Sequence, residues 1–314
     1  MQYVLQDTLK QLYNLIWFCR KVQIPFEVYA FTNEFLRPSM SRQEDRELLR
    51  EHYEKKEGLL RVEEEFCLMN ILNSQTNAKT LEKQMINIWR IALCFREYQN
   101  YTFPHKLSLS GTPLNEALIA LHQVLPKFQK DNNVEKVQCI ILTDGEAHQI
   151  PHHVMVKRSW HEDDQAFLGC RNCHPARTFL RDRKLGKTYG FGYAYHEFTS
   201  TLISNLKDHF PTTNFIGIRV LANRDANRFI KNYASSYLDQ ERLQKEWRRS
   251  KSLTLTNCGY DAYFGMSSTA LAQDAEFDVE EDASKAQIKR AFVKSLKTKK
   301  LNKKVLSQFM ELVA

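Results

Sequence analysis

The stretch that most constrains the fold of this chain is residues 107–148, which join a predicted helix to a predicted buried strand. Thr112 stands directly before Pro113, a pair typical of a helix N-cap followed by proline at the first helical position. Residues 137–143 are almost continuously apolar, as expected of a parallel strand buried on both faces. The helix between them is indicated by leucines at helical spacing: Leu114, Leu118, Leu121 and Leu125.

Asp144 and Gly145 follow the predicted strand directly and form the first candidate site. Ligands of open α/β sheets bind just beyond the carboxyl ends of the strands. A carboxylate on a tight glycine turn suits a hard cation such as Mg²⁺. Two simpler interpretations stay open at this point: Thr112 is only an N-cap, and Asp144-Gly145 is only a turn.

A threonine that opens a helix, followed by a strand that ends in Thr-Asp-Gly, resembles the von Willebrand factor A (VWA) family. The resemblance covers about residues 1–233, and its most specific parts are GTPLNEAL at 111–118 and ILTDG at 141–145. It implies an α/β fold of VWA or Rossmann-like type, with a doubly wound, mostly parallel sheet, helices on both faces and a helical C-terminal extension. It also implies a metal-ion-dependent adhesion site with Mg²⁺ on Thr112 and Asp144. The expected partner-binding residues around it are Ser110, Gly111, Gly145 and Glu146.

Among VWA proteins, the chain looks most like the VWA subunit of cobaltochelatase and its phage-encoded relatives. That resemblance implies a MoxR-type AAA+ ATPase as partner and a cytoplasmic location, in the host if the protein is phage-encoded. An Asp or Glu side chain of a protein partner would complete the coordination shell of the ion. We therefore expect a non-catalytic, metal-dependent interaction subunit of an ATPase-driven complex.

The chain departs from the family at its beginning. A predicted helix at 1–21 and a predicted strand at 25–31 correspond to the first helix and second strand of the family, and no Asp-x-Ser-x-Ser loop occurs in the sequence. The missing first strand is central in the doubly wound order, and each unpaired buried backbone group costs about 1–3 kcal/mol. We expect that Met1 is an internal methionine or that an upstream piece is encoded separately. Mg²⁺ binding would depend on that piece.

The remaining chain divides at residue 250 into a VWA-like domain, 1–250, and a C-terminal part, 251–314, with a hairpin and an acidic then basic helical tail. The domain carries a Cys- and His-containing insertion at 149–195. A short edge strand is predicted at 58–62 and a buried strand at 212–221. Further helices are predicted at 63–73, 80–98, 195–210, 223–233 and 238–250.

The insertion suggests a different function. Cys170 and Cys173 have the spacing of half a structural zinc site. The other half could come from two of four histidines, which makes a zinc-dependent hydrolase, a peptidase or nuclease using the cluster at 148–174, the alternative prediction. A polar loop with incidental thiols also stays open, and the haem-attachment reading of CRNCH is disfavoured without an export signal. The four histidines are His152, His153, His161 and His174.

The charge balance suggests a third function. The net charge is +8, and the lysines of residues 284–304 could bind nucleic acid. Few aromatic residues are interleaved there for stacking on bases, which argues against single-strand binding. No apolar stretch reaches the roughly 18 residues of a membrane span, and the seven cysteines are predicted to be reduced, which fits a cytoplasm-like compartment.

Overall fold

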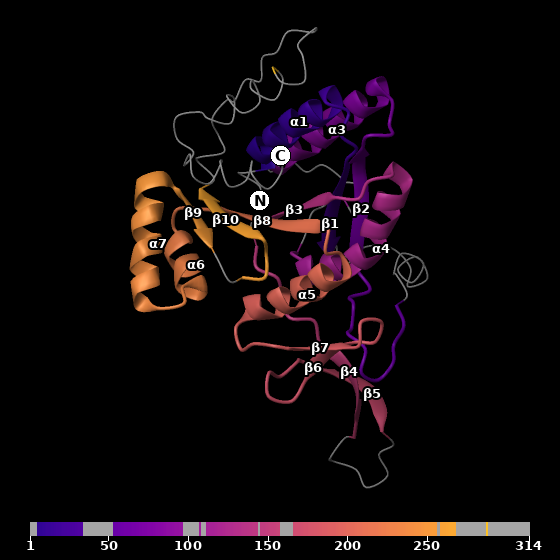
Figure 1. The fold of residues 1–314 in the computed structure, drawn as a ribbon, viewed down its shortest axis with the longest axis vertical. Helices are drawn as coiled ribbons and strands as arrows, with labels where there is room; N and C mark the ends of the chain where they lie inside the picture. The colour runs from indigo at the N-terminus through magenta and orange to yellow at the C-terminus, as the bar shows by residue number, and fades with distance from the viewer. Residues whose placement is uncertain are drawn as a thin grey trace.

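The computed structural model describes residues 5–33, 53–96, 107, 111–143, 145–157, 166–255, 258–267 and 287. Within these residues the protein is a mixed α/β structure with six helices and a sheet that contains parallel and antiparallel strands (Figure 1). The predicted α/β class is confirmed. Ser110, Asp144, His161 and nearly all of the predicted acidic and basic tail lie outside the described residues.

The larger sheet has the order β3-β8-β10-β9. β3 (Val137–Thr143), β8 (Thr213–Leu221) and β10 (Ala262–Ser267) run parallel, and β9 (Ser252–Leu255) pairs antiparallel with β10. β8 has a hydrogen-bonded neighbour on each side and is buried along most of its length. The strands predicted at 137–143 and 212–221 and the predicted terminal hairpin are confirmed.

A separate pair of strands, β1 (Glu27–Asn33) and β2 (Phe66–Asn73), is antiparallel. The helix predicted over 63–73 is wrong, because this short apolar run pairs with β1 along its whole length. A run of this length does not distinguish a strand from a buried helix by periodicity. The edge strand predicted at 58–62 is reduced to one bridge, between Leu60 and His152.

The two sheets are not joined by backbone hydrogen bonds within the described part of the chain. There, β1 pairs with β2, β3 pairs with β8, and neither has a second described partner. The strand that the VWA order places between them is therefore not among the described strands. The hypothesis of an incomplete central sheet stays a prediction.

Helices lie on both sides of the strands (Figure 1). α1 (Leu5–Lys21) and α3 (Ala78–Arg96) pack on each other, and α3 also contacts β2. α4 (Leu114–Asn132) contacts α5 (Tyr195–His209) and both strands of the β1–β2 pair, so it links the two sheets. The last pair, next to β9 and β10, is α6 (Ala226–Tyr233) and α7 (Tyr237–Ser250).

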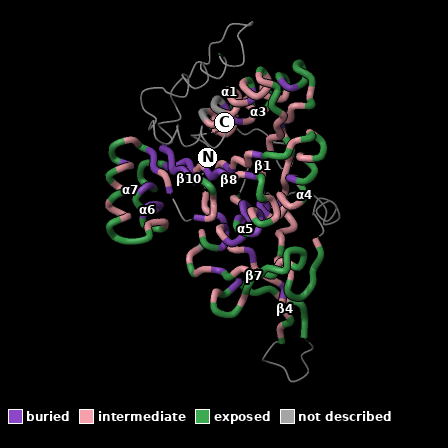
Figure 2. Tube along the Cα trace, in the orientation of Figure 1, coloured by how far each residue is buried: buried purple, intermediate pink, exposed green. Residues whose placement is uncertain are grey.

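The main core lies between the larger sheet and the helices α4 and α5, where buried residues concentrate (Figure 2). Phe198, Ile203 and Phe215 are fully enclosed in it. Cys173 and Phe191 from the 149–195 segment belong to the same cluster. That segment is therefore packed on the domain, and burying its apolar side chains helps to hold it there.

Residues 149–195 contain two antiparallel hairpins, which sequence periodicity did not predict. The first joins β4 (His152–Val156) to β5 (Phe167–Arg171), and the second joins β6 (Phe179–Asp182) to β7 (Lys187–Gly190). Asp182 anchors the second hairpin to α5, since its carboxylate accepts hydrogen bonds from Asn205, at 2.7 Å, and from His209.

Candidate binding site at the ends of β3 and β8

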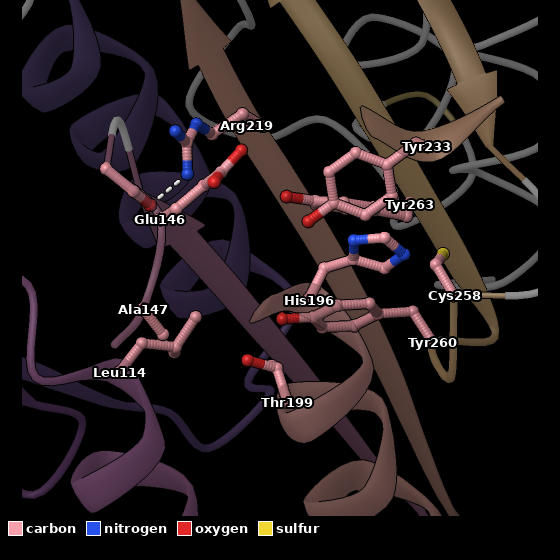
Figure 3. Close-up of a pocket in the computed structure, with 11 residues that line it drawn as sticks. Leu114, Glu146, Ala147, His196, Thr199, Arg219, Tyr233, Cys258, Tyr260 and Tyr263 are labelled. Atoms are coloured by element: carbon pink, nitrogen blue, oxygen red, sulfur yellow. Dashed lines mark hydrogen bonds between the residues drawn. The ribbon is translucent and has the colours of Figure 1, made fainter. Parts of the chain in front are cut away.

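A pocket opens at the carboxyl ends of the parallel strands β3 and β8 (Figure 3), the edge where open α/β sheets bind ligands. It encloses about 350 Å³ of empty space, including the part open to solvent. Its walls come from the loop after β3, the first turns of α5, the end of α6 and the β9–β10 turn. The lining residues are Leu114, Gly145, Glu146, Ala147, His196, Thr199, Arg219, Tyr233, Cys258, Tyr260 and Tyr263.

Thr112 lies against the loop after β3. A Cβ atom at Gly145 would be 2.3 Å from Thr112 Oγ1, so only glycine allows this approach. Gly111, with a φ of 73°, packs in turn against Asn33 at the end of β1. The structure thus brings together the ends of three segments that are far apart in sequence, and Thr112, Gly111 and Gly145 lie at their meeting point.

The predicted helix start is one residue early. Pro113 occupies the N-cap position, α4 begins at Leu114, and no side chain caps the helix. The Thr112 carbonyl accepts a hydrogen bond from the Leu114 amide, at 2.8 Å. The interpretation of Thr112 as an N-cap is therefore wrong, and its hydroxyl faces Gly145 instead.

The turn after β3 is held by side chains on both neighbouring strands. Thr143 Oγ1 accepts a hydrogen bond from the Gly145 amide, at 3.0 Å, and donates one to the Gly145 carbonyl, at 2.6 Å. Arg219 Nη1, from β8, donates to the same carbonyl. This turn is therefore fixed in place rather than free to move with the solvent-exposed loops.

A buried polar chain fixes the rest of the loop. Thr199 Oγ1 donates to Asn115 Oδ1, at 2.8 Å, and Asn115 Nδ2 donates to the His148 carbonyl, at 2.5 Å. Asn115 is completely buried. A buried amide stripped of its partners costs about 1–3 kcal/mol, so this chain ties α4, α5 and the loop together.

Aromatic rings form the opposite wall. Tyr260 and Tyr263 are stacked with centroids 4.8 Å apart, and His196 lies 4.3 Å from Tyr233. A Cβ atom at Gly217 of β8 would be 2.5 Å from the Tyr263 ring, so the stacked rings rest directly on the strand.

Burial sets the protonation of this wall. It raises the pKa of Tyr263 to about 12 and that of Tyr233 further still, so both hydroxyls are protonated at neutral pH. Burial also lowers the pKa of His196, which favours the neutral imidazole.

Arg219 is the most unusual group of the pocket. Its residue is only 8% exposed, and its Nε is buried without a hydrogen-bond partner. Within the described residues, no carboxylate lies within ion-pair distance of it; Glu146, the nearest acidic lining residue in the view of Figure 3, accepts from Asn232 at 3.4 Å. Buried charges are usually paired, so the pocket carries a positive charge that no described group balances.

The described residues do not make up a magnesium site. Mg²⁺ requires several oxygen ligands in near-octahedral geometry, and of the predicted ligands only Thr112 is described. No group of three or more His, Cys, Asp or Glu side chains that could hold a metal occurs in the described part of the chain. The guanidinium of Arg219 beside Gly145 also repels a second cation. Mg²⁺ on Thr112 and Asp144 stays a prediction.

The predicted zinc ligands fall into two pairs. His153 lies opposite Cys170 in the β4–β5 register, with Nδ1 and Sγ 3.4 Å apart, while His152 Nδ1 lies 3.8 Å from Cys173 Sγ. Neighbouring residues of a strand point to opposite faces, which separates the pairs. His174 accepts from the Ala176 amide, at 3.2 Å. The described residues thus assemble no four-ligand site, and zinc stays a prediction.

Several pocket residues were missed from the sequence. Arg219 was treated only as part of a buried strand, although a charge inside the apolar run NFIGIRVL is itself a signal of a buried pair or ligand. Asn115 was hidden in a helix pattern. Tyr233 and Tyr263 come together only through the packing of α6 against the larger sheet.

No protein-family model matches this chain, and no curated protein or solved structure is similar to it. The VWA resemblance therefore rests on the residues and the strand order alone. Among the described helices, none has the length and apolar character needed to cross a lipid bilayer.

Proposed function

We propose that this chain is a protein-interaction subunit that captures an acidic side chain of a partner at the carboxyl ends of β3 and β8. By its resemblance to the VWA subunit of cobaltochelatase, the partner is a MoxR-type AAA+ ATPase. The observation that carries the proposal is the buried, unbalanced charge of Arg219 in the pocket beside Gly145. An acidic partner group supplies the missing negative charge.

The arrangement of the strands supports the finer fold proposal, a VWA or Rossmann-like doubly wound domain. Three parallel strands stand side by side, and the Thr-Asp-Gly turn follows the outermost of them, β3. The contact of Thr112 with Gly145 supports a site shared between the two loops that the resemblance pairs.

The chemistry of the pocket favours binding over bond making. Burial raises the pKa of Cys258 to about 11, so its thiol is not the thiolate that nucleophilic catalysis requires. Thr199 is engaged with Asn115. The described lining residues therefore offer no activated nucleophile, which agrees with a non-catalytic subunit.

The test is capture of the MoxR-type ATPase of the same organism by the tagged chain. Asp144→Ala is expected to reduce capture at least about tenfold, the loss of one charge-assisted contact. Asp131→Ala, an exposed carboxylate at the end of α4, is the matched control and should capture normally. Near-ultraviolet circular dichroism checks the fold. Undiminished capture by Asp144→Ala contradicts the proposal. A loss in EDTA that Mg²⁺ restores supports the predicted ion.

The two thiol–imidazole pairs of the β4–β5 hairpin keep zinc as a second candidate. A zinc-dependent hydrolase would purify with one tightly bound zinc and would lose it on Cys170→Ser and Cys173→Ser. Metal analysis of the intact chain decides this candidate, and a metal content below about a tenth of an equivalent excludes it.

A further inference from the structure

We propose that Arg219 receives the carboxylate of the partner's acidic side chain directly, so that the pocket is an anion site that works without a metal ion. The identity of the partner rests on the proposed function, whereas the ability of the pocket to bind a carboxylate does not. The inference comes from the position and unused hydrogen-bonding capacity of this one side chain.

Arg219 is placed at the end of the sheet by its register. It lies between Thr143 of β3 and Gly265 of β10, at the last level of strand pairing before the loop that carries Gly145. Its Nη1 donates to the Gly145 carbonyl, which fixes the orientation of the guanidinium. A fixed guanidinium presents its remaining N–H groups in a rigid fork that matches a carboxylate.

The remaining capacity of Arg219 is buried but unused. Its Nε has no hydrogen-bond partner although it is shielded from solvent, within the described residues. A buried donor left without a partner costs about 1–3 kcal/mol, and more when the group is charged. Binding an anion removes that cost, whereas a metal ion in the same place would increase the repulsion.

The groups around Arg219 also favour an anion. The hydroxyls of Tyr233, Tyr260 and Tyr263 point toward the side of the pocket that holds Arg219 (Figure 3), and those of Tyr233 and Tyr263 stay protonated, able to donate. The amino end of α5 borders the pocket through His196, and its dipole favours negative charge.

The charge of the pocket selects a carboxylate over a phosphate. One guanidinium supplies a single positive charge, and Glu146 lines the same pocket with a negative one. A singly charged carboxylate is balanced by Arg219, while a doubly charged phosphate is repelled more strongly by Glu146. The partner group is therefore an Asp or Glu side chain or a chain terminus.

The experiment follows the Arg219 Nε–H resonance by NMR in the full chain while acetate, the probe, is added in EDTA-containing buffer at constant ionic strength. The resonance is assigned by its loss in Arg219→Lys. We expect a saturable shift for the wild type and tighter binding, by about threefold or more, in Glu146→Gln, because that variant removes a repelling charge. Tyr263→Phe should bind acetate less tightly, since it keeps the ring but loses the hydroxyl.

Three outcomes overturn the proposal. The first is a shift that does not saturate. The second is an affinity unchanged in both Glu146→Gln and Tyr263→Phe, which does not depend on whether Arg219 variants fold. The third is a preference for inorganic phosphate over acetate. An acetate failure with intact, Asp144-dependent capture of the ATPase overturns the role of Arg219 alone, while acetate binding without capture overturns the proposed partner.

Discussion

The four-stranded sheet and the β1–β2 pair differ in how far their strands are buried. In β8 all but two residues, Asn214 and Ile218, are buried, whereas in β1 Thr32 alone reaches that level. β8 has hydrogen-bonded neighbours on both sides, and β1 has one described neighbour. A site needs a rigid support, and the candidate pocket stands at the end of the better buried sheet.

The apolar clusters repeat this difference. The cluster around Ile16, Leu72 and Leu81 under the β1–β2 pair is small and separate from the main core. α4 is the element that contacts both regions. We therefore expect the β1–β2 region to open as a local unit while the larger sheet stays closed.

The largest expected effect separates the two regions. Leu72→Ala removes a side chain that is 1% exposed and should destabilise the β1–β2 region by about 3 kcal/mol. Amide hydrogen exchange should accelerate in β1, β2, α1 and α3 but not in β8. Leu93→Ala, the same change at a position 37% exposed on α3, is the control and should have little effect. Equal acceleration in β8 would show that the two regions open together.

The next effect tests the support of the pocket. Gly217→Ala places a Cβ atom 2.5 Å from the Tyr263 ring and should cost about 2 kcal/mol, measured by urea unfolding, because the stacked tyrosines must leave the strand. Gly190→Ala is the matched control, since nothing lies within 4 Å of its Cβ position. Similar stability for the two variants would mean that the rings do not rest on β8 in solution.

A smaller effect comes from the junction between the regions. Burial raises the pKa of Glu116, in the first turn of α4, to about 7, and the charge of Glu63 adds to the shift. A carboxyl group with a raised pKa stabilises the folded state at low pH, and this contribution is lost as the pH rises from about 4.5 to about 7. Glu116→Gln should remove that decline and stabilise the protein at pH 8 by on the order of 1–2 kcal/mol. Parallel pH–stability curves would contradict this account.

The smallest effect concerns the β6–β7 hairpin on the better buried side. Burial alone would raise the pKa of Asp182, but hydrogen bonds from the Leu185 amide, Asn205 and His209 outweigh it and lower the pKa. The contribution is present above the ordinary carboxyl pKa of about 4 and is lost as the pH falls below it. Asp182→Asn should weaken hairpin protection from hydrogen exchange by about 1 kcal/mol at pH 7. Unchanged protection would remove Asp182 as the anchor.

The sequence predicted the parts of the molecule whose local pattern agrees with their tertiary surroundings. β3 and β8 are buried on both faces and read as apolar runs, and α4 and α5 have clear helical stripes. β2 was mistaken for a helix because only its pairing with β1 decides its form.

The pocket could be predicted only in part, for a similar reason. The meeting of Thr112 with Gly145 follows from strand order, but the wall of Tyr233 and Tyr263 depends on how α6 packs. The Cys-x-x-Cys spacing suggested one zinc site, yet the alternation of the strand sends His152 and His153 to opposite faces. Spacing in a sequence gives neighbours along the chain, and strand geometry decides which of them share a face.

The most direct measurement is a hydrogen-exchange footprint of the chain with and without the MoxR-type ATPase. The account predicts new protection at Gly145–His148, in the first turn of α5 and near Tyr233, with the β1–β2 pair and the β4–β5 hairpin unchanged. Protection confined to those two hairpins, with none at the carboxyl ends of β3 and β8, would contradict it.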